Sequence, residues 1–246
     1  MKAVVLGATK GIGRAVARAL AVRGDQLYLL GRDREELDRS ASDLEQRGGG
    51  KGHVASAICD LERPETFELA LDSADRSLSG FDTVIVTAAL FGTQDALEED
   101  AEFARKLLTV NFANTVVFCE LARKRLLARG GGTLCVVSSV AGERGRKPVV
   151  LYGASKAGLS AYLEGLDHKF HSQGLRVVTI KPGFVKTSMT EGLKPPPFAT
   201  GPEQVARDML RAIERGTPVV YTPRIWQLVM MVIRALPRFI MRRLGF

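Results

Sequence analysis

The sequence has few cysteines and no long apolar run. Cys59, Cys119 and Cys135 are odd in number, far apart and flanked by apolar residues, which favours buried free thiols over disulfides or a metal site. The longest uninterrupted apolar stretch, residues 228–233, is far shorter than the ~20 residues of a membrane span. The apolar run at residues 3–6 is too short for a signal peptide. We therefore expect a cytoplasmic protein that does not cross a membrane.

Acidic residues are absent from one part of the chain. The 246 residues carry a formal charge of +8, from 35 Lys and Arg against 27 Asp and Glu. Residues 217–246 contain five arginines and no acid, so the rest of the chain is nearly neutral. Basic residues are not interleaved with aromatics, which argues against a nucleic-acid partner. An apolar content of 46% excludes a disordered chain.

Apolar runs of strand length alternate with amphipathic runs of helix length. This alternation predicts an α/β fold, a Rossmann-like doubly wound parallel sheet of about seven strands with helices on both faces. The predicted strands are residues 3–7, 26–30, 54–59, 83–88, 133–138, 177–181 and 218–221. The predicted helices are residues 11–23, 33–47, 64–78, 152–173 and 202–215, with one long helix or two in 96–128. We expect one domain over residues 1–222, with an amphipathic tail over 223–246.

A glycine-rich turn follows the first predicted strand and opens the first helix. It contains Gly7, Gly11 and Gly13. Residues without a Cβ allow a tight strand-to-helix turn and close approach of a pyrophosphate to backbone N–H groups. The helix N-terminus also attracts an anion. This context predicts a dinucleotide site.

An acid–base group is predicted where residues 152–156 begin a helix. Tyr152 and Lys156 are four residues apart and share one helix face. A nearby ammonium is expected to lower the pKa of the tyrosine toward the operating pH. Ser139, at the end of a strand, can donate a hydrogen bond to a substrate oxygen, and Ser138 is its rival. This set suits proton transfer at a carbonyl or alcohol oxygen.

Five sequence motifs together resemble the short-chain dehydrogenase/reductase family over nearly all of residues 1–190. They are the Gly-x-x-x-Gly-x-Gly turn, Val-Asn-Phe at 110–112, Ser-Ser-Val-Ala-Gly at 138–142, Tyr-Gly-Ala-Ser-Lys at 152–156, and Pro-Gly-Phe-Val at 182–185 followed by Thr187. The resemblance implies hydride transfer between a nicotinamide and a carbonyl or alcohol. It implies Tyr152 as general acid or base, Ser139 orienting the substrate, Lys156 on the nicotinamide ribose, and Asn111 supporting a relay water.

The resemblance also implies a cofactor site and a substrate lid, the latter at about residues 186–201. The implied cofactor-binding residues are Gly7, Thr9, Lys10, Gly11, Ile12, Gly13, Arg32, Asp60, Leu61, Ala88, Tyr152, Lys156, Pro182, Gly183, Val185 and Thr187. No metal site is expected, since His168 and His171 have no third ligand nearby in the sequence.

The residues after the second predicted strand favour NADP(H) over NAD(H). An NAD site usually has an acidic residue there for the ribose hydroxyls. Here Gly31 occupies that position and Arg32 follows it. A guanidinium at this point, with Lys10 close by, can bind a 2′-phosphate. In the resembled family, this pair is typical of NADP-preferring members.

The chain departs from the resembled pattern at two contacting positions. Leu6 stands where a threonine is common, and Thr87 stands where an asparagine is common. We expect packing to replace the usual hydrogen bond between these elements.

The tail beyond residue 222 leaves two interpretations open. Arg234, Arg238 and Arg242 recur every four residues and are expected to line one helical face, with Pro237 breaking or kinking the segment. Such a helix suits a membrane interface, or it packs over the cleft or on a partner subunit. The sequence thus predicts an NADP(H)-dependent enzyme acting on a hydrophobic or lipid-linked carbonyl or alcohol. It is expected to be a homodimer or homotetramer, with possible peripheral contact at the inner face of the membrane. The alternative is a non-catalytic NADP(H)-binding sensor on the same fold.

Overall fold

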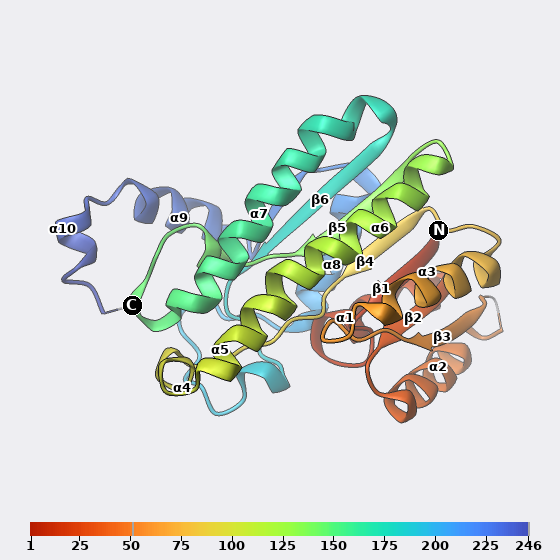
Figure 1. Cartoon of the computed structure of the whole chain (residues 1–246), viewed down its shortest axis with the longest axis horizontal. Coiled ribbons are helices and arrows are strands. Elements are labelled where there is room, and N and C mark those ends of the chain that lie inside the picture. Colours follow the sequence, from red (N-terminus) through yellow and green to blue (C-terminus); the bar gives the residue numbers. More distant parts are fainter. Residues whose placement is uncertain (51, 246) are drawn as a thin grey trace.

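The protein forms a single seven-stranded parallel sheet covered by helices on both faces (Figure 1). This computed structural model describes residues 1–50 and 52–245. The strand order is β3-β2-β1-β4-β5-β6-β7, and every neighbouring pair is parallel. The strands are β1 (Lys2–Leu6), β2 (Gln26–Gly31), β3 (Val54–Ile58), β4 (Thr83–Val86), β5 (Gly132–Val137), β6 (Leu175–Pro182) and β7 (Val219–Thr222). The predicted doubly wound sheet is therefore confirmed.

Helices connect successive strands, as the alternation in sequence predicts. The α-helices of the described residues are α1 (Gly11–Arg23), α2 (Arg34–Gly48), α3 (Glu65–Leu78), α4 (Gln94–Glu99), α5 (Ala101–Leu108), α6 (Thr115–Ala128), α7 (Val150–Phe170), α8 (Pro202–Arg215), α9 (Ile225–Ala235) and α10 (Arg238–Met241). A π-helical segment, η1 (Thr109–Asn114), joins α5 to α6, and η2 to η5 are short 3₁₀ turns at Val140–Gly142, Lys147–Val149, His171–Gln173 and Ser188–Thr190. The segment predicted as one or two helices is thus divided among α4, α5, η1 and α6.

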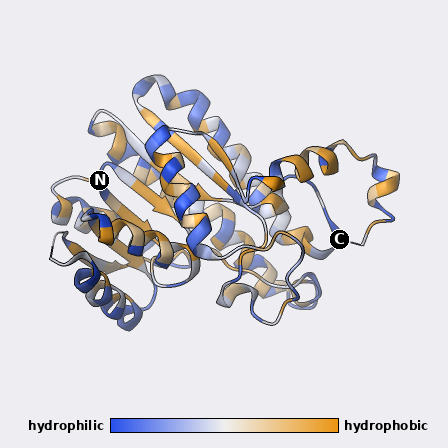
Figure 2. Ribbon diagram, turned by 180° about the vertical axis from the view of Figure 1, so that it is seen from behind, coloured by the Kyte–Doolittle hydropathy of each residue, from blue (hydrophilic) through white to orange (hydrophobic). Residues whose placement is uncertain are grey.

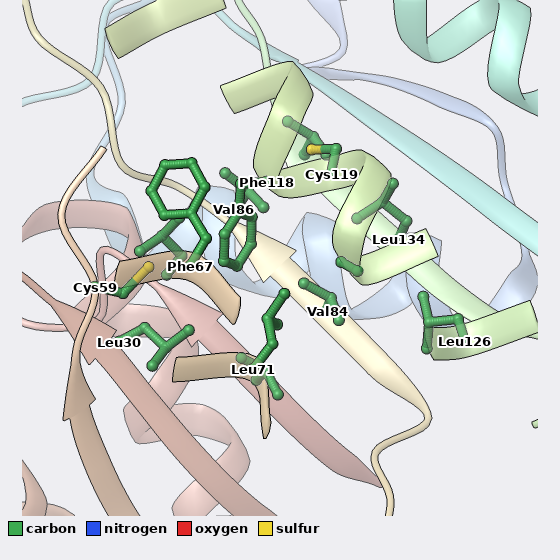
Figure 3. Packing of buried hydrophobic residues seen from close by; sticks show 14 of the residues in the cluster. Leu30, Cys59, Phe67, Leu71, Val84, Val86, Phe118, Cys119, Leu126 and Leu134 are labelled. Carbon is green, nitrogen blue, oxygen red and sulfur yellow. The ribbon is translucent and has the colours of Figure 1, made fainter. Parts of the chain in front are cut away.

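Alternating side chains of the central strands enter two separate cores. In β1, Val4 and Leu6 belong to one core, whereas Ala3 and Val5 belong to the other. The first core is closed by α3, α6 and α7, and Figure 3 shows the packing of Phe67, Phe118 and their neighbours in it. The second core is closed by α1, α2 and α8. Since both faces are buried, the central strands are mostly apolar on both faces.

All three cysteines are buried free thiols inside these cores, as predicted. Cys59 and Cys119 lie in the core of Figure 3, and Cys135 lies in the other. Burial raises the pKa of Cys59 to about 12 and raises the pKa of the other two thiols as well. These cysteines therefore act as small apolar side chains.

The parallel arrangement brings the carboxyl ends of all strands to one edge of the sheet. β1 lies between β2 and β4, so the chain connections diverge to opposite sides at this point. A crevice outside the strand ends at such a divergence is where ligands bind in open α/β sheets. The residues predicted for the cofactor and for catalysis follow the ends of β1 to β6, with Tyr152 and Lys156 on α7 beside them.

The tail adds a third apolar cluster outside the two sheet cores. Trp226, Met230 and Ile233 of α9 pack against Val140, which follows β5, and against Tyr221 of β7. Figures 1 and 2 show α9 and α10 extending from the body at the side away from β3. No helix of residues 1–50 and 52–245 is long and apolar enough to cross a membrane.

The expectation of a single arginine face along the tail is wrong. Helix α9 ends at Ala235 because Leu236 is extended (φ −64°, ψ 130°) ahead of Pro237, as expected for a residue before proline. Arg234 therefore lies on α9, whereas Arg238 begins α10.

Candidate active site

The glycine-rich turn is shaped by two glycines that admit no side chain. Gly7 has φ +88°, in the left-handed region. A Cβ on Gly13 would lie 2.1 Å from the Gly7 carbonyl oxygen. This approach packs the start of α1 directly on the end of β1, leaving its N-terminal amides to face the crevice. The turn is also tied to β2, since the Gly7 N–H donates to the Leu30 carbonyl (2.9 Å).

A hydrogen bond joins the glycine turn to β4, which corrects the expectation that packing replaces it. The Thr87 hydroxyl donates to the carbonyls of Leu6 (3.0 Å) and Gly7 (3.2 Å). The Ala88 N–H donates to Leu6 as well (3.3 Å). The expectation was wrong because the backbone carbonyl of Leu6 serves as acceptor, so residue 6 needs no polar side chain.

The remaining residues predicted for the cofactor gather around this turn. A Cβ on Gly11 would lie 3.3 Å from the Thr187 methyl group, and one on Gly31 would lie 3.8 Å from the Thr9 methyl group. Residues from three separate segments thus meet at one place: the turn that leads from β1 into α1, the end of β2, and the segment after β6. Asp60 follows β3 and accepts from the N–H of Glu62 (3.0 Å). Ile12 and Val185 pack in the core that α1 closes, whereas Leu61 lies in the core on the other face of the sheet.

The two serines after β5 have different environments. Ser138 is buried, its hydroxyl donates to the Lys156 carbonyl (3.0 Å), and it pairs with the Ser160 hydroxyl (2.7 Å). Ser139 accepts from the N–H of Ala141 (3.1 Å) and interacts with the side chain of Tyr152. Ser138 therefore anchors α7 to the sheet, whereas Ser139 lies with the tyrosine.

Tyr152 and Lys156 lie together, but the pKa of the tyrosine differs from expectation. The Lys156 ammonium is 5.8 Å from the Tyr152 ring centroid and donates to the Val137 carbonyl (3.1 Å). Burial raises the pKa of Tyr152 to about 12, and the interaction with Ser139 opposes this rise. The expected lowering by the ammonium is thus wrong for this structure. Lys156 is 2% exposed, and burial lowers its pKa to about 8.

Asn111 is buried in η1 and holds a neighbouring loop. Its amide oxygen accepts from the Leu90 N–H (2.7 Å), and its amide nitrogen donates to the Leu90 carbonyl (2.7 Å). These paired bonds fix the loop after β4 beside α7. The role of Asn111 toward a relay water stays a prediction.

Two residues near Tyr152, and one that follows the Ser139 loop, are not found by motif reasoning. Phe91 packs edge-on against the Tyr152 ring at 5.2 Å. The Gln94 amide oxygen accepts from the N–H of Leu151, next to the tyrosine (3.2 Å). Glu143 follows the Ser139 loop and pairs with Lys181. Only the position of residues 91 and 94 after a central strand signals their closeness, since all strand ends share one edge.

The two ends of the predicted lid are hydrogen-bonded to each other, and the residues between them are largely exposed. Val185 bridges to Thr200, and the N–H of Lys186 donates to the Thr200 carbonyl (2.8 Å). Phe198 packs edge-on against Trp226 of α9 at 6.5 Å. A Cβ on Gly183 would overlap the Trp226 indole. The tail helix thus contacts both the Pro-Gly turn after β6 and the lid.

Residues 1–197 match the family described as short chain dehydrogenase. The chain belongs to this family. Its geometry agrees: the strand order, the glycine turn, and the Ser139, Tyr152 and Lys156 set lie at one edge. The short-chain dehydrogenase fold binds a nicotinamide cofactor, and the side-chain-free turn at Gly7 and Gly13 suits a pyrophosphate. Among the residues that the structure describes, no three His, Cys, Asp or Glu side chains cluster to hold a metal ion.

Curated relatives match this short-chain dehydrogenase over almost its full length. An uncharacterised oxidoreductase of Mycobacterium tuberculosis is 32% identical over 98% of this chain and 96% of its own. One from Streptomyces coelicolor is 34% identical over 98% and 94%. Carbonyl reductase family member 4 of Xenopus tropicalis is 28% identical over 85% and 89%. The chain is therefore an oxidoreductase of short-chain dehydrogenase type.

Solved structures share the fold. A short-chain type dehydrogenase/reductase from Mycobacterium ulcerans has a TM-score of 0.81 at 22% identity, covering 89% of this chain and 86% of its own. A variant of actinorhodin polyketide ketoreductase with NADPH has a TM-score of 0.79 at 21% identity, covering 89% and 94%.

The buried ammonium of Lys156 predicts a pH-dependent stability. Its folded pKa of about 8 lies below the unfolded value, so the unfolded state holds the proton more strongly between pH 8 and pH 10. The free energy of unfolding should therefore rise with pH across this window by about 2 kcal/mol relative to Lys156→Met. The window ends near the unfolded lysine pKa of 10.5. The buried thiols and Tyr152, whose raised pKa values act oppositely at alkaline pH, are present in both proteins and cancel in the comparison. Urea titrations of both proteins without cofactor measure the difference, and parallel curves would contradict it.

Proposed function

We propose that this short-chain dehydrogenase interconverts a carbonyl and an alcohol by hydride transfer, with NADP(H) as cofactor. The observation that carries this proposal is the grouping of Ser139, Tyr152 and Lys156 beside the strand ends. A hydroxyl, a phenol and an ammonium in a buried position suit proton transfer to an oxygen atom. The relative described as a carbonyl reductase supports this reaction class.

In the direction of reduction, Tyr152 donates its phenolic proton to the substrate oxygen. Bound NADPH supplies the hydride for the carbonyl carbon. Ser139 donates a hydrogen bond that orients the oxygen. With a pKa of about 12, Tyr152 is protonated at neutral pH and ready to donate. Lys156 is charged below its pKa of about 8, so its ammonium would be available to hold the nicotinamide ribose.

Two cations beside the end of β2 support NADP(H). Arg32 is 63% exposed, and its nearest acidic partner, Glu62, is 3.5 Å away. Glu62 is paired more closely with Lys106 (2.8 Å). Arg32 can therefore turn toward a phosphate while the Glu62 carboxylate keeps a cationic partner. Lys10 is exposed in the glycine turn, next to Thr9 and hence near Gly31. A guanidinium and an ammonium at this position suit a 2′-phosphate.

Apolar side chains near the lid and tail favour a hydrophobic or lipid-linked substrate. Phe91 and Val140 are close to the catalytic set, since they contact Tyr152 and follow Ser139 respectively. Phe198 and Met189 of the lid segment are exposed and apolar. Apolar surroundings of this kind suit an alkyl or prenyl chain better than a small polar ketone.

A panel of carbonyl compounds with NADPH tests the proposed function. The panel contains lipidic ketones, lipid-linked keto-sugars and small polar ketones, and NADPH oxidation is followed at its absorbance band. We expect turnover of at least one lipidic carbonyl and little turnover of the polar ones. A wild type that binds NADPH tightly yet reduces no member would instead favour a cofactor-binding sensor.

A further inference from the structure

Helix α9 presents apolar side chains on two opposite faces. Trp226, Met230 and Ile233 form its inner face and are at most 9% exposed. The outer face is defined by Leu228, Met231 and Val232, which are 58%, 56% and 58% exposed; Ile225 and, on α10, Phe239 extend it. Figure 2 shows the largely hydrophobic ribbon of this segment projecting from the body. A helix with apolar side chains on two opposite faces is expected to be covered on both, and here the body covers only one.

The inner face is held to the body by polar contacts as well as by packing. Arg234 pairs with Glu143 at 3.1 Å, and the Glu143 carboxylate is 6% exposed. Arg144 donates to the carbonyl of Leu236 at 2.9 Å, just past the end of α9. The helix therefore cannot roll to bury its outer face against the body, because that would strand the buried Glu143 carboxylate with one partner fewer.

The charged side chains that the tail itself contributes around the outer face are all arginines. Arg224, Arg238, Arg242 and Arg243 are exposed, and none has an acidic partner among residues 1–50 and 52–245. The sequence has no Asp or Glu from residue 217 onward. An apolar face flanked by unpaired arginines matches a surface that is apolar inside and anionic outside, which describes the interface of an anionic bilayer.

We propose that the outer face of α9, together with Phe239 and the flanking arginines, docks the protein on the surface of an anionic lipid bilayer. The helix lies in the interface, since its 11 residues are too few to cross. A second copy of the chain is the less fitting occupant. A two-fold contact through this face would bring the arginines of two identical tails together without acids from either.

This docking places the bilayer beside the lid. Trp226 on the inner face of the same helix contacts Phe198 and the Gly183 turn. A lipid-linked substrate would then reach Tyr152 without leaving the interface, a consequence that rests on the proposed function. The docking itself does not depend on the proposed function, so vesicle binding is measured without enzyme turnover.

Co-sedimentation of the full chain with phosphatidylcholine vesicles, with and without phosphatidylglycerol, tests the proposal. We expect binding to the anionic vesicles, weakened about tenfold or more by Leu228→Ser/Val232→Ser. Arg238→Gln/Arg242→Gln should weaken it too and flatten its salt dependence. The matched control is Val22→Ser/Leu69→Ser, which removes exposed side chains (65% and 72%) from α1 and α3, away from the tail, and should bind like wild type.

Folding of each variant is checked by thermal unfolding and by NADPH binding, so a loss of vesicle binding is not mistaken for unfolding. Trp226 is the only tryptophan of the sequence, and its emission should stay shielded from acrylamide on the vesicles. No binding to anionic vesicles, or equal binding by the outer-face variant, overturns the proposal. The proposal is also overturned if the wild type does not bind vesicles and forms a dimer that the outer-face variant dissociates. That result would assign the outer face to a contact with a second copy of the chain.

Discussion

Tyr152→Phe should lower turnover by about 100-fold to 10,000-fold while leaving NADPH affinity within a few-fold of wild type. The substitution removes one hydroxyl and keeps the ring that packs against Phe91 at 5.2 Å. The proton for the substrate oxygen would then have to come from water, which is a poorly positioned donor. Single-turnover oxidation of NADPH with the best carbonyl of the panel, and a separate binding titration, measure the two quantities.

Tyr162→Phe is the matched control on the same helix. The Tyr162 hydroxyl donates to Glu120 at 2.9 Å, so its loss affects stability without touching the reacting atoms. We expect its turnover to stay within a few-fold of wild type. If Tyr152→Phe keeps wild-type turnover, the assignment of the general acid is wrong. If both variants lose turnover equally, the loss results from altered packing of α7, and the assignment of Tyr152 as general acid is unsupported.

Arg32→Asp should reverse the cofactor preference, weakening NADPH binding about 100-fold or more relative to NADH. A charge-assisted hydrogen bond to a phosphate contributes about 1.5–3 kcal/mol, and the new carboxylate adds repulsion. Each 1.4 kcal/mol changes the dissociation constant tenfold. NADH carries hydroxyls at the same place, and an aspartate can accept hydrogen bonds from them. Dissociation constants of both cofactors, measured at one salt concentration, give the ratio.

Arg39→Asp controls for the overall change of charge. Arg39 is 66% exposed on α2 and pairs with Glu36 at 3.0 Å, beyond the turn at Gly31. The same charge reversal there should leave the NADPH-to-NADH ratio almost unchanged. An unaltered ratio in Arg32→Asp would remove Arg32 from the phosphate site. A second measurement on Lys10→Gln then tests the other cation of the pair.

Local patterns of the sequence sufficed for the sheet and for the positions of the motifs. Alternating apolar runs predict strands with both faces buried, and a helix after each strand forces the parallel order. Parallel strands end at one edge, so residues that follow neighbouring strands, such as Gly7 after β1 and Thr87 after β4, must lie near one another. The proximity in space of residues that are tens of positions apart in the sequence is thus predictable, because neighbouring parallel strands end side by side.

The predictions that failed depend on surroundings that no local pattern contains. The Thr87 hydroxyl donates to the backbone carbonyls of Leu6 and Gly7. Every residue type has such a carbonyl, so the sequence does not indicate which ones accept a side-chain hydrogen bond. The pKa of Tyr152 rises because burial outweighs its polar neighbours, while Lys156 points to Val137. Burial is a property of all the elements that pack around a group, and these come from separate parts of the chain.

The sequence by itself determined the fold, the family, and a tail that is basic and apolar, because periodicity and motif spacing are local. Only the tertiary structure decided how that tail packs. It turned Arg234 inward to the buried Glu143 carboxylate, ended α9 ahead of Pro237, and left Leu228 and Val232 facing outward. Which of two apolar helix faces is buried depends on what the rest of the chain brings against it, and here that was the Ser139 loop and the end of the sheet.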